Sequence, residues 1–176
     1  MNRNNFKREH ESFSLVINAS AEKIFPLLCP VEEQKWFWDE SDYSMIYSDS
    51  GYSENNCIFL ENTSGPFLMK SNMAEPTYWV TTLYDKGNYV IHWVHVRSSS
   101  ITKQEVSLKV IGPLETEVTW DKTMTAIKEE AGPIFDAELK DRMKMMMAYI
   151  VQFLKYYCET GTRLVSNKTG ERGKDS

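Results

Sequence analysis

Cysteine is scarce in this sequence of 176 residues, and the three that occur, Cys29, Cys57 and Cys158, are widely spaced. An odd number at such spacings matches neither a disulfide framework nor a zinc-ligand pattern. No apolar run approaches the roughly 18–20 residues of a membrane span. Residues 1–13 lack the apolar core of a secretory signal. We therefore expect a reduced, cytoplasmic protein that does not insert into a membrane.

Positive charge is also in short supply, with 20 Lys and Arg against 25 Asp and Glu and a net charge of −5. Proteins that bind nucleic acid generally carry a basic stripe that neutralises phosphates, and none is visible here. The glycine-rich, nucleophile-elbow and H-E-x-x-H motifs of nucleotide-binding proteins, hydrolases and zinc peptidases are missing as well. The three histidines, His10, His92 and His95, offer no convincing metal set. We expect no nucleic-acid partner, no metal and no cofactor.

The chain nevertheless has the composition of a folded domain, with 41% hydrophobic and 26% charged residues. Its length suits one domain with a sizeable core. We expect that domain to occupy residues 1–160. The polar segment that follows, residues 161–176, is predicted to be a disordered tail.

The order of the predicted elements is the most informative feature. A strand over residues 11–18 alternates apolar and polar side chains, and Ser20 then caps a short helix that prolines interrupt. Six further strands are predicted at residues 43–47, 57–61, 78–84, 89–97, 101–111 and 117–127. From about residue 133 to 160 the apolar period becomes helical, and Gly161 suits the C-terminal cap. This order predicts an α+β fold, in which a curved antiparallel sheet of about seven strands wraps around one long C-terminal helix and leaves a cavity between them.

The turns of three successive hairpins predict which side chains face the helix, because side chains alternate between the two faces of a strand. A turn at Lys86-Gly87 pairs Tyr78 with His95 and Val80 with Trp93. The later turns pair Trp93 with Gln104, Ile91 with Val106, Gln104 with Lys122, and Val106 with Trp120. The inward face then collects Val80, Ile91, Trp93, Val106, Leu108, Val118, Trp120 and Met124, and the outward face is polar. One bulge would shift this register.

Four polar side chains, Tyr78, His95, Gln104 and Lys122, fall close together toward one end of the predicted inward face. Long charged side chains are almost never fully buried without a partner. We therefore expect this end to be the open mouth of the cavity and the apolar end to be its floor. Lys122 could pair with a ligand carboxylate, polarise a carbonyl, or pair with an acidic residue such as Glu61.

The opening segment, FSLVINASAEKIFPLLCPVEEQKWFWDES, resembles the START-like superfamily, also called SRPBCC, in its first strand, small-residue turn, short helix and following tryptophan. The likeness extends in layout over roughly residues 10–160. It implies the helix-grip fold and a cavity that binds a hydrophobic or amphipathic small molecule. Polyketide cyclase/dehydrase-like and Hsp90-activator-like proteins belong to the superfamily, so the resemblance does not choose between carriers, enzymes and co-chaperones.

Candidate ligand-binding residues come from the inward face of the sheet and from the methionine-rich helix. Methionine can line an adaptable pocket or merely fill the core, and both interpretations stay open. Trp36 and Trp38 are predicted to lie in a rim segment, where they either gate the mouth of the cavity or serve as a lid on the core. The candidates are Tyr78, Val80, Trp93, His95, Gln104, Val106, Trp120, Lys122, Phe135, Leu139, Met143, Met146 and Met147.

Three functions remain open at this point. The leading hypothesis is the binding of a lipid-like or aromatic small molecule without catalysis. An alternative is a polyketide cyclase or dehydratase that uses His95 and Lys122 as acid–base partners. A protein-interaction module like the Hsp90-activator relatives is a third hypothesis, although no sequence feature supports a protein partner.

Overall fold

The structure, a computed structural model, describes residues 6–37, 43–62 and 75–164. Strand β1 (Arg8–Ile17) is followed by helix α1 (Ala21–Ile24), the 3-10 helix η1 (Phe25–Leu28) and helix α2 (Pro30–Glu33). The remaining strands are β2 (Tyr43–Tyr47), β3 (Ile58–Glu61), β4 (Thr77–Asp85), β5 (Val90–Val96), β6 (Ser100–Gly112) and β7 (Glu115–Ala126). The 3-10 helix η2 (Glu129–Ala131) then leads to the long helix α3 (Leu139–Thr160).

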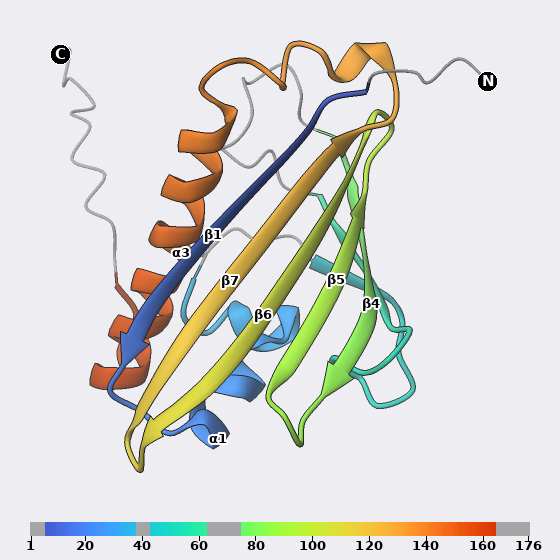
Figure 1. The fold of residues 1–176 in the computed structure, drawn as a ribbon. Coiled ribbons are helices and arrows are strands. Elements are labelled where there is room, and N and C mark those ends of the chain that lie inside the picture. The colour runs from blue at the N-terminus through green and yellow to red at the C-terminus, as the bar shows by residue number, and fades with distance from the viewer. Residues whose placement is uncertain (1–5, 38–42, 63–74, 165–176) are drawn as a thin grey trace, which may run out of the picture.

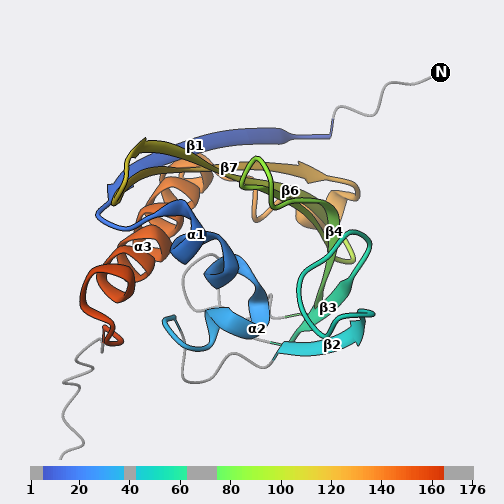
Figure 2. The ribbon, with the colours of Figure 1, turned by 90° about the horizontal axis from the view of Figure 1, so that it is seen from below.

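The seven strands form one antiparallel sheet in the order β1-β7-β6-β5-β4-β3-β2. The long strands β1, β7, β6 and β5 run side by side, and α3 lies beside β1 (Figure 1). Seen along the strands, the sheet bends from β1 and β7 round to β3 and β2, with α1 and α2 on its concave side (Figure 2). This is the predicted α+β arrangement, a curved sheet around one long C-terminal helix.

Helix α3 begins at Leu139, so the prediction of a helix from residue 133 is wrong. Residues 132–138 form turns instead, and Asp136 holds them in place: its carboxylate accepts hydrogen bonds from the Glu138 amide (3.0 Å) and from Arg142 Nη1 (2.9 Å). Such local side-chain bonds compete with helix formation. The other end agrees with the prediction, because Gly161 has a φ of 71° and its amide donates to the Tyr157 carbonyl.

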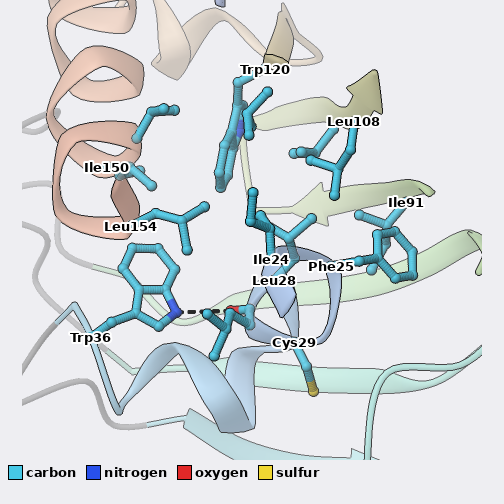
Figure 3. Packing of buried hydrophobic residues seen from close by; sticks show 14 of the residues in the cluster. Ile24, Phe25, Leu28, Cys29, Trp36, Ile91, Leu108, Trp120, Ile150 and Leu154 are labelled. Atoms are coloured by element: carbon cyan, nitrogen blue, oxygen red, sulfur yellow. Dashed lines mark hydrogen bonds between the residues drawn. The ribbon is translucent and has the colours of Figure 1, made fainter. Parts of the chain in front are cut away.

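The short helical segment after β1 packs its apolar side chains into the largest buried cluster (Figure 3). Ile24, Phe25 and Leu28 meet side chains from the sheet and from α3 there. Trp36 is fully buried at the same place and its indole donates to the Leu27 carbonyl (2.8 Å), so Trp36 is a core residue and the predicted rim position is wrong for it. Ser20 stands at the predicted N-cap of α1, but its side chain makes no capping hydrogen bond.

The predicted register is correct for two of the three hairpins. Trp93 lies opposite Gln104, and Gln104 lies opposite Lys122, as the turn lengths required. The β6–β7 pairs of Val106 with Trp120 and of Leu108 with Val118 are also observed. These agreements place the inner faces of β5, β6 and β7 as predicted.

The register predicted between β4 and β5 is wrong. The connecting loop contains four residues, 86–89, and a β-bulge lies between Thr81 and Leu83. This loop is two residues longer than the predicted turn, a difference that by itself leaves the same side chains facing inward. The extra residue at the bulge, in contrast, exchanges the inward and outward side chains in the part of β4 that precedes it. Trp79 therefore pairs with His95, and Tyr78 is 47% exposed on the outer face. Val80 shares that outward orientation with Tyr78, so neither side chain points toward the helix.

Candidate functional site

A belt of polar side chains interrupts the apolar inner face of the sheet. On β7, Lys122 stands between Trp120, which belongs to the larger apolar cluster, and Met124, which belongs to a smaller one. On β6 the inner-face residues next to Val106 are Gln104 and then Thr102, and on β5 the inner-face residue next to Trp93 is His95. We call this set the polar belt; it consists of Glu33, Glu61, His95, Ser100, Thr102, Gln104 and Lys122.

The sheet register determines the layout of the belt. Trp93, Gln104 and Lys122 occupy one row across β5, β6 and β7. Trp79, His95 and Thr102 occupy part of the next row, across β4, β5 and β6. Adjacent strands lie about 4.8 Å apart, so the first row extends about 10 Å across the sheet.

Lys122 is the most unusual member of the belt because it is a buried cation. It is 7% exposed, and among the described residues its ammonium forms no hydrogen bond or ion pair. Its cross-strand neighbour on β1 is Glu11, yet those two side chains do not form an ion pair either. Burial lowers the pKa of Lys122 to about 8, with repulsion from Arg97 adding to the effect and Glu61 and Glu33 opposing it.

His95 stacks on the indole of Trp79, and its buried Nε2 atom has no hydrogen-bond partner in the part of the chain that the structure describes. Burial lowers the pKa of His95 well below its usual range, and the positive charges of Lys122 and Arg97 lower it further. The imidazole is therefore neutral at pH 7, and one ring nitrogen can donate while the other accepts. Trp79 is fixed in turn, because its Nε1 donates to Glu61 (2.9 Å).

Glu33 is a belt residue that the sequence interpretation missed. It is 6% exposed at the end of α2, and burial raises its pKa to about 8, with a further contribution from Glu61 that Lys122 opposes. Glu33 is thus neutral at pH 7 and can donate a hydrogen bond. Glu33 lies three residues from the buried Pro30 and three from the buried Trp36, but nothing in the local sequence marks it as buried.

Several buried donors on the inner face have no partner among the described residues. They are the indole N–H groups of Trp93 and Trp120 and the hydroxyl of Ser100. Buried indole N–H groups ordinarily find an acceptor, and an unsatisfied one costs about 1–3 kcal/mol. Indole and ammonium groups can only donate, so this region has a surplus of donors and needs acceptors.

The other predicted site residues are mostly buried. Met143 and Met147 are fully buried on α3, and Met146 is half-buried against the larger cluster. Phe135 and Leu139 belong with Met143 to the smaller cluster, although Phe135 precedes the helix. Trp38 and the acidic residues Asp39, Glu40 and Asp42 lie outside the described residues, as does most of the predicted tail, residues 165–176.

Glu61 was one predicted partner for Lys122, but in the structure it accepts a hydrogen bond from Trp79 instead. It approaches Lys122 closely enough to raise the pKa of the ammonium, but forms no ion pair with it. Within residues 6–37, 43–62 and 75–164, no group of three or more His, Cys, Asp or Glu side chains is arranged to hold a metal ion. No helix in the same ranges is long and apolar enough to cross a membrane.

Comparison with known proteins gives no match to a family model and no significant match among curated sequences. Solved structures do match. A START superfamily protein from Mycobacterium smegmatis shares 14% identity, with a TM-score of 0.64 over 87% of this chain and 99% of its own. Norcoclaurine synthase from Thalictrum flavum shares 10% identity, with a TM-score of 0.63 over 89% of this chain and 98% of its own.

A third solved structure is the Zhui aromatase/cyclase from Streptomyces sp. R1128, at 11% identity and a TM-score of 0.60 over 87% of this chain and 94% of its own. Each of the three matches spans nearly the whole of the solved chain, so the likeness concerns the complete fold rather than one motif. At such low identity it establishes the architecture alone. The chain therefore has the START-like, helix-grip fold.

Proposed function

We propose that this protein binds an amphipathic small molecule in its interior, between the sheet and α3. The ligand's polar group meets the polar belt, and its apolar part lies against methionine and tryptophan side chains. The observation that carries this proposal is a set of donors that find no partner among the described residues: the buried N–H groups of Trp93 and Trp120, the buried hydroxyl of Ser100, and the ammonium of the largely buried Lys122. A native fold rarely leaves so many buried donors unsatisfied in one region, and a bound ligand would supply the missing acceptors.

The apolar surroundings of the belt suit the rest of such a ligand. Met143 and Met147 come from α3, and Val106 comes from the sheet. Methionine side chains are unbranched and polarizable, so they adapt to ligands of different shape. Two proteins of the same fold support the idea: one is an aromatase/cyclase, and the other was solved in complex with a transition-state analogue.

The test is native purification followed by mass spectrometry of an organic extract. We expect an amphipathic lipid or aromatic compound that is present at close to one equivalent and is lost on denaturation. A variant with Trp93 and Trp120 both changed to Phe should retain less of it, because the rings remain while both N–H donors are gone. If neither the extract nor added amphipathic probes show binding to the folded protein, the proposal is wrong.

A second candidate function is acid–base catalysis on a ligand with carbonyl groups, and the unpartnered Nε2 of His95 favours it. A neutral imidazole there could remove a proton from the carbon beside a carbonyl while Lys122 hydrogen-bonds the oxygen that becomes an enolate. Attack of that carbon on a second carbonyl would close a ring, and the imidazolium would return its proton to the new alkoxide. His95→Ala would then abolish turnover with the fold intact, whereas His92→Ala, on the outer face, would not.

A further inference from the structure

The charges inside the polar belt do not balance. Two acidic and two basic side chains are involved: Glu33, Glu61 and Lys122 belong to the belt, and Arg97 follows β5 beside it. Glu61 accepts a hydrogen bond from Trp79, and Arg97 Nε donates to Thr77 Oγ1 (2.8 Å). The negative charge of Glu61 and the positive charge of Arg97 also favour each other. Lys122 is therefore the belt's one cation for which the described residues provide no hydrogen bond or ion pair.

Glu61 attracts the Lys122 ammonium, but it also attracts Arg97 and forms no ion pair with Lys122. The other described neighbours do not pair with Lys122 either. Glu33, on α2, is neutral at pH 7 because burial raises its pKa to about 8. Tyr43, on β2, is neutral too, since burial and the two nearby carboxyl groups hold its pKa well above its ordinary value. His95 is an uncharged imidazole, and Gln104, opposite Lys122 on β6, has no charge. Glu11 faces Lys122 across the β1–β7 ladder and forms no ion pair with it.

We infer that the ligand of the polar belt is a monoanion, and that Lys122 is the counter-ion of its negatively charged group. The inference rests on the proposed function and adds the ligand's charge to it. Trp120 lies two residues before Lys122 on the same face of β7, and Trp93 lies in the same row as Lys122. Their N–H groups supply further donors to anionic oxygens, while the buried ammonium gains the partner that makes its burial tolerable.

Lys122 and Glu33 together then set the upper pH limit of binding. Below about pH 8 the ammonium is charged and the Glu33 carboxyl is neutral, so the belt has one uncompensated positive charge. As pH rises through 8, Lys122 loses its charge and Glu33 gains a negative one. Both changes weaken the attraction of an anion, so affinity for an anionic ligand should decline on the alkaline side of neutrality.

Two fluorescent probes with one scaffold test the inference: 8-anilino-1-naphthalenesulfonate is an anion, and N-phenyl-1-naphthylamine is its neutral counterpart. The wild-type protein should bind the sulfonate more tightly at pH 7. Lys122→Met should weaken sulfonate binding by roughly ten- to a hundredfold, the size of a lost charged hydrogen bond, and change binding of the neutral probe by less than about twofold. Lys122→Arg should retain the preference for the anion. Lys103→Met, on the outer face of β6, should change neither affinity.

The outcomes separate this inference from the proposed function. If both probes bind and Lys122→Met affects them equally, or affects neither, the ligand is not held as an anion by Lys122, although interior binding survives. If neither probe binds the wild-type protein and its organic extract contains no amphipathic compound, the inference is refuted together with the proposed function. Glu33→Gln provides a second check, because it should reduce the loss of sulfonate affinity between pH 7 and 9 relative to wild type.

Discussion

The imidazole of His95 stacks on the indole of Trp79, with ring centroids 3.9 Å apart and planes inclined by 24°. The pair exists because of the β-bulge between Thr81 and Leu83, which turns Trp79 inward to face His95 across the β4–β5 ladder. Without the bulge, the same register would place Val80 opposite His95. The stack covers one face of the imidazole, and the Trp79 hydrogen bond to Glu61 ties the stack to β3.

Trp79→Ala should lower the free energy of unfolding by about 3–5 kcal/mol, because the indole is 8% exposed and its loss leaves a void beside His95. Tyr78→Ala, one residue away on the outer face, should change it by less than about 1 kcal/mol. Urea unfolding of the two variants measures the difference. Equal losses would mean that the inner and outer faces of β4 are not as described.

Helix α3 can be tested in the same way, since Met147 is fully buried and Met145 is 57% exposed. Met147→Ala should cost about 2–5 kcal/mol of unfolding free energy through lost contacts and a residual void. Met145→Ala should stay within about 0.5 kcal/mol of wild type. A reversed order in thermal or urea unfolding would contradict the rotation of the helix about its axis.

The hydropathy pattern alone predicted which face of α3 is buried, because apolar residues spaced three or four apart form the buried stripe of a helix. The same reasoning gave the registers of the β5–β6 and β6–β7 hairpins, whose inner and outer residues differ clearly in polarity. Strand β4 has no such contrast: Tyr78, Val80 and Thr82 are about as apolar as Trp79 and Thr81. The bulge therefore exchanges the inward and outward side chains of β4, and the hydropathy pattern of the strand gives no sign of it.

The candidate site shows the same limit. His95, Gln104 and Lys122 were predicted to share the inner face because their strands alternate cleanly, and they do. Glu33 was overlooked because a glutamate in a short acidic turn is usually solvent-exposed. Its burial depends on contacts with distant segments, which local sequence patterns do not record. The start of α3 was misplaced for a local reason, the hydrogen bonds of Asp136.

Glu33 should make the protein less stable as pH rises from about 5 to 8. Its pKa is about 8 in the folded state against 4.5 ordinarily, so between these values the folded state binds the extra proton, and its stabilising effect is lost as pH rises through 8. The decline should amount to a few kcal/mol, of order 1.4 kcal/mol per pKa unit. Urea unfolding at pH 5, 6.5 and 8 should show a flatter profile for Glu33→Gln.

The matched control for that profile is Glu32→Gln. Glu32 is the neighbouring residue on α2, half-buried and ion-paired with Lys35. This variant should keep the wild-type dependence on pH. A Glu33→Gln profile that parallels wild type would show that the carboxyl is already ionised in the folded protein below pH 8.

All three thiols should be unreactive in the native protein, because Cys29, Cys57 and Cys158 are buried. Burial also raises the pKa of Cys57, and it raises the pKa of Cys158 to about 11, so the reactive thiolate is rare at neutral pH. Ellman's reagent at pH 7.5 should detect less than about 0.2 equivalents within minutes, and close to three equivalents in 6 M guanidinium chloride. Stoichiometric labelling of the folded protein would contradict this burial.

Trp120→Phe separates the fold from the proposed binding function. Phenylalanine keeps an aromatic ring at this position but removes the unpartnered N–H, whose burial costs about 1–3 kcal/mol. The smaller ring also loses apolar contacts, and that loss costs a similar amount, so ligand-free stability should change by less than about 1 kcal/mol. Binding of 8-anilino-1-naphthalenesulfonate should nevertheless weaken several-fold, because one donor to the anion is gone.

Trp36→Phe is the contrasting variant. The Trp36 indole donates to the Leu27 carbonyl, so its replacement should lower the stability of the protein. The molecules that remain folded should keep the wild-type affinity for the sulfonate. If Trp120→Phe were instead strongly destabilising and left sulfonate affinity unchanged, its indole N–H would have a structural role and the donor surplus of the inner face would not indicate a ligand.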